Sequence, residues 1–180
     1  MRYNNIFRHA VPIVLLLAPA ALAQQSPKVL VASGKEVAAG MQDPGTLACI
    51  GGTPTGKPLQ CSPGTTKVLL SYWVSLQGYQ DVVGTAAAMF RGQNTIVMHC
   101  NLDANYYGHC WGHFLWDAPD AGGKWEGVWS GIWEMATNRL SYHMTGYGTG
   151  GQLEGLQFEK DGAWPGGTPS GTFVVKVFAK

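Results

Sequence analysis

The stretch from Trp125 to Trp133 reads WEGVWSGIW, and it carries the clearest fold signal in the chain. On an extended strand, successive side chains point to opposite faces, so one face would alternate strictly between tryptophan and glycine. That face carries Trp125, Gly127, Trp129, Gly131 and Trp133, and the other carries Glu126, Val128, Ser130, Ile132 and Glu134. Glycine between bulky rings leaves room for an indole to lie over the backbone, or for a side chain of a neighbouring strand to enter.

The tryptophan face has three interpretations. It can be the interior of a small barrel, which is often filled by alternating large and small residues. It can be an aromatic platform for a sugar or a flat apolar molecule, or a contact between subunits. The direction in which the three indoles point distinguishes the first interpretation from the other two.

A period of two also marks Val68–Leu76, where the even-numbered positions are all apolar. Further strands are expected at Val29–Ala32, Asp81–Arg91, Thr95–Asn101, His109–Trp116, Lys124–Glu134, Arg139–Thr145, Gly151–Phe158 and Thr172–Phe178. No stretch after residue 23 shows a convincing apolar stripe of helical period. The pattern predicts an all-β fold, a single antiparallel β-barrel of about eight strands, with a β-sandwich as the alternative.

The first 23 residues have the features of a signal peptide. Arg2 and Arg8 precede an apolar run, VPIVLLLA over 11–18, and Ala21-Leu22-Ala23 is a cleavage signal of small residues. An uncleaved amphipathic anchor is the alternative. We therefore expect residues 24–180 to form one exported domain, periplasmic or secreted, with no membrane span. The formal net charge of +1 gives no electrostatic reason to expect nucleic acid as a partner.

Four cysteines in an exported chain favour disulfides. Three pairings are open, and the local one, Cys49–Cys61 with Cys100–Cys110, is preferred because it closes two short, turn-rich loops. The first bridge would staple a long loop over 41–66. A metal site is not expected: His109 and His113 on one strand would stand roughly 13 Å apart, too far to bind one ion. No cofactor is predicted.

The candidate site combines the tryptophan face with nearby polar residues, at Trp111, His113, Trp125, Glu126, Trp129, Trp133 and His143. No catalytic constellation is expected among them. Glu126 and Glu134 share a face but would lie roughly 26 Å apart, whereas glycosidase carboxylates lie about 5–9.5 Å apart. The glycines at 146–151 match a dinucleotide motif formally, but no acidic residue follows at the required distance.

The run Gly148-Thr-Gly-Gly-Gln-Leu-Glu-Gly-Leu156 resembles the C-terminal strand turn of allene oxide cyclase and dirigent-type barrels and their bacterial relatives. The resemblance covers about residues 110–159. It implies an eight-stranded antiparallel barrel with a small internal cavity, in which activity depends on shaping an apolar cavity around a reactive substrate. No catalytic residue of that family can be matched to a position in this chain.

Three functions follow as hypotheses. The first is a non-catalytic exported barrel that binds a small apolar or ring-bearing ligand through an aromatic-lined cavity or face. The second is a cavity-type cyclase or isomerase in which Glu126, His113 or His143 handles a proton. The third is a structural or interaction protein of the cell envelope. The oligomeric state is left open.

Overall fold

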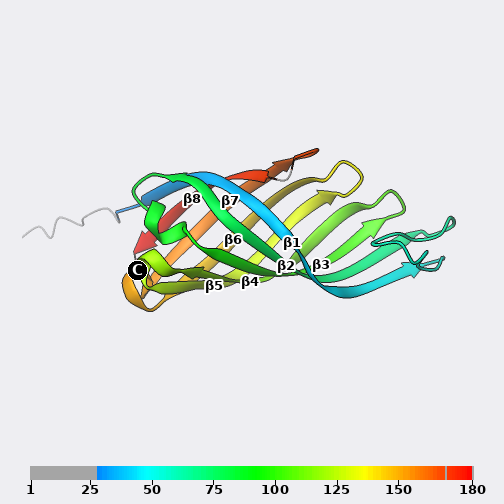
Figure 1. Ribbon diagram of the computed structural model, residues 1–180, viewed down its shortest axis with the longest axis horizontal. Helices are drawn as coiled ribbons and strands as arrows, with labels where there is room; N and C mark the ends of the chain where they lie inside the picture. Colours follow the sequence, from blue (N-terminus) through cyan, green and yellow to red (C-terminus); the bar gives the residue numbers. More distant parts are fainter. Residues whose placement is uncertain (1–27, 169, 180) are drawn as a thin grey trace, which may run out of the picture.

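The computed structural model describes residues 28–168 and 170–179, with no side-chain description for 38–44 and 77–80 (Figure 1). The predicted signal peptide lies outside the described residues. The described residues form eight strands: β1 (Leu30–Ile50), β2 (Lys67–Val83), β3 (Gln93–Asp103), β4 (Tyr107–Ala118), β5 (Gly123–Glu134), β6 (Arg139–Thr149), β7 (Leu156–Pro165) and β8 (Ser170–Ala179). In the part of the chain that the structure describes, no helix is long and apolar enough to cross a membrane.

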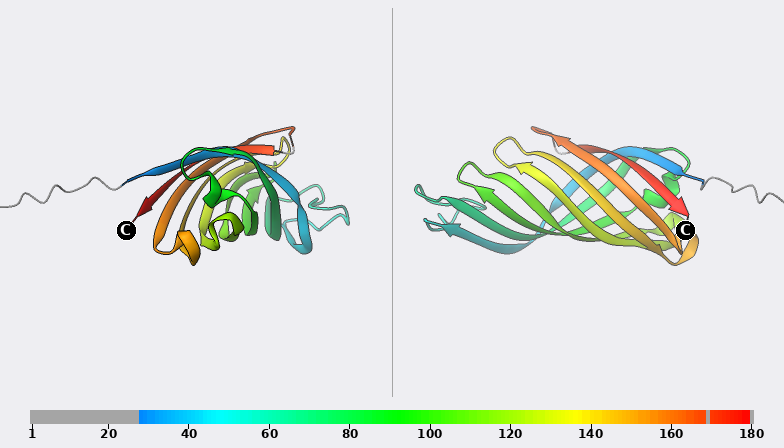
Figure 2. Two further views of the ribbon diagram at one scale, coloured as in Figure 1. Left: turned by 60° about the vertical axis from the view of Figure 1, so that its left-hand side comes forward. Right: turned by 180° about the vertical axis from the view of Figure 1, so that it is seen from behind.

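All strands belong to one antiparallel sheet, so the predicted all-β class is confirmed and two packed sheets are not observed. Each strand pairs with the next along the chain, and β1 pairs with β8 as well as with β2. The sheet therefore curls round until its last strand meets its first, as the views from two further directions show (Figure 2). The concave inner face holds the core and the outer face meets solvent.

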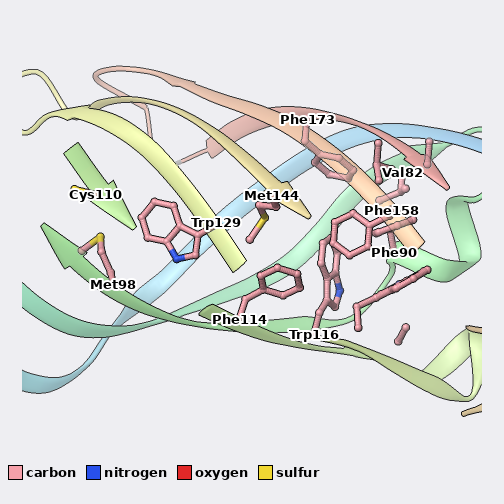
Figure 3. Packing of buried hydrophobic residues seen from close by; sticks show 14 of the residues in the cluster. Val82, Phe90, Met98, Cys110, Phe114, Trp116, Trp129, Met144, Phe158 and Phe173 are labelled. Atoms are coloured by element: carbon pink, nitrogen blue, oxygen red, sulfur yellow. The ribbon is translucent and has the colours of Figure 1, made fainter. Parts of the chain in front are cut away.

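The two ends of the curled sheet differ. At one end, the connections between strands contain three short 3₁₀ helices, η1 (Ala87–Phe90), η2 (Pro119–Ala121) and η3 (Gly151–Leu153). Phe90 of η1 is fully buried there, stacked on Trp125 at 5.3 Å between ring centroids and edge-on to Trp116 at 5.1 Å. We call this end of the sheet, which carries the three 3₁₀ helices, the helix end, and aromatic side chains fill it (Figure 3). The opposite end carries the turns from β1 to β2, β3 to β4, β5 to β6 and β7 to β8.

Three predicted boundaries are wrong. Residues 41–50 belong to β1 and not to the loop predicted over 41–66, because a register shift between Gln42 and Thr46 lets Pro-Gly sit within a paired strand. No separate strand forms over 81–91, because residues 81–83 are the end of β2, Gly84 takes a φ of +111° and the 3₁₀ helix η1 follows. Similarly, β7 begins at Leu156 and not at Gly151, whose φ of +52° lies in η3.

The disulfides have the predicted local pairing. Cys100 and Cys110 are directly opposite each other on β3 and β4, and both are buried in the core. Cys49, near the end of β1, is bonded to Cys61 in the connection to β2. The backbone N–H of Cys61 donates to the Tyr106 hydroxyl at 2.6 Å, which ties this connection to the turn between β3 and β4.

Candidate functional site

A cavity of about 210 Å³ lies on the inner face of the sheet, toward the end opposite the 3₁₀ helices. Its wall is mostly apolar. The aliphatic and sulfur-bearing part of the wall comes from the three strands β2, β3 and β6 and consists of Val74, Leu76, Ile96, Met98, Leu140 and Met144. Side chains of Trp129, Met98 and Met144 approach one another in this region (Figure 3). A polarisable, adaptable lining of this kind suits an apolar ligand.

The three tryptophans of β5 all lie on the inner face, as the interior interpretation predicts, but only two reach the cavity. Trp125 is fully buried in the helix end, where its indole N–H donates to the carbonyl of Met89 at 2.7 Å. Trp129 and Trp133 form part of the cavity wall. The Trp129 N–H donates to the carbonyl of Val97 at 3.0 Å, which fixes the ring in place.

The glycines of β5 admit side chains of neighbouring strands. A Cβ at Gly127 would lie 2.9 Å from Cζ of Phe114, a residue of β4, and the same contact would arise at Gly146 on β6. The Phe114 ring therefore occupies the space that these two glycines leave. The alternation of tryptophan and glycine therefore packs the interior. Two of its tryptophans, Trp129 and Trp133, also line the cavity.

A buried ion pair stands beside the cavity. Lys160 Nζ lies 2.6 Å from Glu36 Oε2, and neither side chain has exposed surface. Glu36 Oε1 accepts hydrogen bonds from the Tyr142 hydroxyl and from Trp164 Nε1, the latter at 3.0 Å. The carboxylate thus receives three donors, which is what a buried charge requires if it is to be tolerated away from water.

The Lys160 ammonium is surrounded by aromatic rings. Nζ lies 4.7 Å from the centroid of Phe173, 4.9 Å from that of Trp116 and 5.1 Å from that of Tyr142. Burial lowers the pKa of Lys160, and the charge and hydrogen bond of Glu36 oppose this shift. Cation–π contacts and the ion pair together stabilise the charged form at this position.

Two further glycines make room for the aromatic donors. Gly162 on β7 pairs with Tyr142, and a Cβ at that position would overlap the phenol ring. Gly171 on β8 pairs with Glu36, and a Cβ there would lie 2.6 Å from the Trp164 indole. Both donors therefore reach Glu36 only because the adjacent strand presents a hydrogen atom in place of a side chain.

Four of the predicted site residues lie on the outer face and do not reach the cavity, so the structure does not bring them together with Trp129 and Trp133. They are Trp111, His113, Glu126 and His143. The reason is strand parity: each is an odd number of residues from an inward-facing neighbour on its own strand. Trp111, for example, is 41% exposed, whereas Trp116 on the same strand is fully buried.

The outward residues have local partners of their own. His143 Nδ1 lies 2.7 Å from Asp161 Oδ1, and the Tyr147 hydroxyl donates to Glu126 Oε2 at 3.1 Å. The hydrogen bond to Glu126 and its negative charge raise the pKa of Tyr147. His113 contacts the exposed Trp73 edge-on at 6.5 Å between ring centroids. Among the described residues, no group of three or more His, Cys, Asp or Glu side chains is placed to hold a metal ion.

Sequence reasoning missed the polar members of the site: Glu36, Tyr142, Lys160 and Trp164. A signal for Lys160 was present, because it occupies a core-facing position of β7 between the buried Phe158 and Trp164. An ionisable residue at an apolar position of an alternating strand indicates a buried, paired charge. Its partner could not be identified in that way, since Glu36 is 124 positions away in the chain.

No protein-family model, curated protein or solved structure matched this chain when it was compared with them.

Proposed function

We propose that this protein is an exported eight-stranded β-barrel that binds a small apolar, ring-bearing ligand in its interior without transforming it. The observation that carries the proposal is the cavity bounded by Trp129, Trp133 and Trp164 within an otherwise well-filled interior. Indole faces pack well against flat rings, and the surrounding aliphatic side chains add area that a ligand would remove from water.

The size of the cavity limits the ligand. A dry cavity of about 150 Å³ lined by apolar side chains is known to hold benzene. At about 210 Å³, the space here suits a somewhat larger molecule, with one or two fused rings. A long-chain lipid would have to leave much of its length outside.

The architecture supports entry from one side. Phe90, Trp116 and Trp125 pack together at the helix end, so a ligand would enter between the turns at the opposite end. Among the cavity residues, Asn138 lies in the turn between β5 and β6 and is exposed, which places the cavity close to that rim. The two disulfides are compatible with an oxidising, extracytoplasmic compartment.

The test is a tryptophan fluorescence titration of residues 24–180 with a panel of aromatic, lipid and sugar compounds. An apolar ring compound is expected to change the emission of the wild type, and Trp133→Phe should reduce that change. Trp111→Phe is the matched control, because it removes an exposed indole from the outer face. No spectral change with any compound, or an equal loss in both variants, would contradict the proposal.

A further inference from the structure

We infer that the cavity selects a ligand whose buried end is a hydrogen-bond donor without negative charge, a hydroxyl or an amine, and that it rejects a carboxylate. This inference rests on the proposed binding function and adds the chemistry of the ligand. It follows from how the Glu36–Lys160 pair is oriented relative to the cavity.

The two charges of the pair differ in their position relative to the cavity. Glu36 borders the cavity, although its side chain has no exposed surface, whereas Lys160 does not border it. The ammonium lies against Trp116 and Phe173, which do not line the cavity, and behind the ring of Tyr142, which does. The pair is thus a dipole with its negative end toward the cavity. In a poorly screened interior, such a dipole favours positive or donor groups and disfavours anions.

The hydrogen bonds to the Glu36 carboxylate support the same inference. The donors next to Glu36 are the Tyr142 hydroxyl, Trp164 Nε1 and Lys160 Nζ, and each donates to its carboxylate. A carboxylate offers about four acceptor positions, and among the described residues the donors take both on Oε1 and one on Oε2, which leaves one position on Oε2. A ligand donor can satisfy that position after a small shift of the wall, whereas a ligand carboxylate would need donors that are already engaged.

The apolar lining does not counteract this preference. Trp129, Trp133 and Trp164 present indole rings, which attract cations and tolerate neutral rings. The remaining polar side chain of the wall, Asn138, is exposed at the rim. A carboxylate could therefore be solvated only by staying outside, which would withdraw its ring from the interior and weaken binding.

The test compares four ligands that share one ring system: 2-naphthol, 2-naphthylmethylammonium, 2-methoxynaphthalene and 2-naphthoate. Their affinities for wild-type residues 24–180 are measured by isothermal titration calorimetry at neutral pH. We expect the naphthol and the ammonium compound to bind at least tenfold more tightly than the naphthoate, and the naphthol more tightly than its methyl ether. This comparison needs no variant and so does not depend on whether one folds.

A double variant, Glu36→Gln/Lys160→Met, then removes the dipole while leaving an acceptor for Tyr142 and Trp164. The discrimination between naphthol and naphthoate is expected to fall to within threefold. The inference would be overturned if naphthoate bound the wild type as tightly as naphthol does. It would also be overturned if the discrimination persisted in a folded double variant. Either result would leave the proposed function standing. Failure of all four compounds to bind would count against both.

Discussion

Lys160 and Glu36 are joined by a 2.6 Å ion pair across the interior of the sheet, from β7 to β1, with no exposed surface on either side chain. The two strands are not neighbours, because β8 lies between them. The pair therefore links the first strand of the sheet to its next-to-last strand independently of the backbone hydrogen bonds. Its energetic role depends on the balance between attraction and the cost of removing two charges from water.

Removing one partner of the pair should destabilise the fold more than removing both. Lys160→Met leaves a buried carboxylate with no counter-charge, a change that typically costs about 3–5 kcal/mol. Glu36→Gln/Lys160→Met leaves no buried charge and should recover most of that loss. Urea unfolding of residues 24–180 measures both values. A double variant no more stable than Lys160→Met would contradict this account of the pair.

The lowered pKa of Lys160 predicts how stability depends on pH. Between its lowered folded pKa and the ordinary value of 10.5, the unfolded chain binds more protons than the folded one. The contribution of this group to the free energy of unfolding therefore rises with pH through that window. Tyr72 and Tyr147, whose pKa values are raised, act in the opposite direction as pH increases around 10.

The Lys160 contribution is isolated by subtracting the curve of Glu36→Gln/Lys160→Met from that of the wild type, since both retain the tyrosines. The difference in the free energy of unfolding should increase toward pH 10.5 in urea titrations over an alkaline series. A flat or falling difference would show that Lys160 does not titrate as its burial requires.

The two disulfides should differ in their resistance to reduction. Cys100 and Cys110 are buried on paired strands, whereas Cys61 lies in the connection between β1 and β2 and is only partly buried. Mild dithiothreitol treatment followed by alkylation and peptide mass spectrometry should label Cys49 and Cys61 first. Each bridge is expected to contribute about 3 kcal/mol from loop closure. The pair Cys100→Ala/Cys110→Ala should cost more than Cys49→Ala/Cys61→Ala because it also leaves a void in the core.

Gly162 should control the position of Tyr142. A Cβ at this position would overlap the phenol ring, so Gly162→Ala is expected to move Tyr142 away from Glu36 and to cost about 1–3 kcal/mol through overpacking. Ala163→Ser, one residue further along on the exposed face of β7, is the control and should change stability by less than about 0.5 kcal/mol. Thermal unfolding and ligand affinity are measured on both, and an unchanged Gly162→Ala variant would contradict the overlap.

Strand periodicity predicted much of the fold. The alternation over Trp125–Trp133 predicted which side chains share a face, and the opposite orientations of Trp111 and Trp116 follow from the same rule. The prediction failed where backbone irregularity overrides local signals. The register shift after Gln42 holds Pro-Gly within β1, and no local pattern distinguishes such a shift from a loop.

The candidate site was predictable only in part, because some of its residues are far apart in the sequence. Trp129 and Trp133 could be placed on one face of their own strand, and the structure shows that this face is the inner one. The charges beside the cavity meet because β8 lies between β1 and β7, which is a property of the order of strands in the sheet and not of any one segment. The outward residues His113 and His143 were grouped with the tryptophans by residue type, although their strand parity places them on the other face.

Filling the cavity should abolish binding without unfolding the protein. Leu140 lies in the cavity wall on β6, so Leu140→Trp places an indole in the ligand's space and should weaken affinity for the best ring compound at least tenfold. Leu115→Trp is the matched control, since Leu115 is 40% exposed on the outer face of β4, and its affinity should stay within twofold of the wild type. Calorimetric titration of both variants, after thermal unfolding has shown them to be folded, measures the difference. Equal affinity in the two variants would place the ligand outside the cavity, because only the first substitution changes its volume.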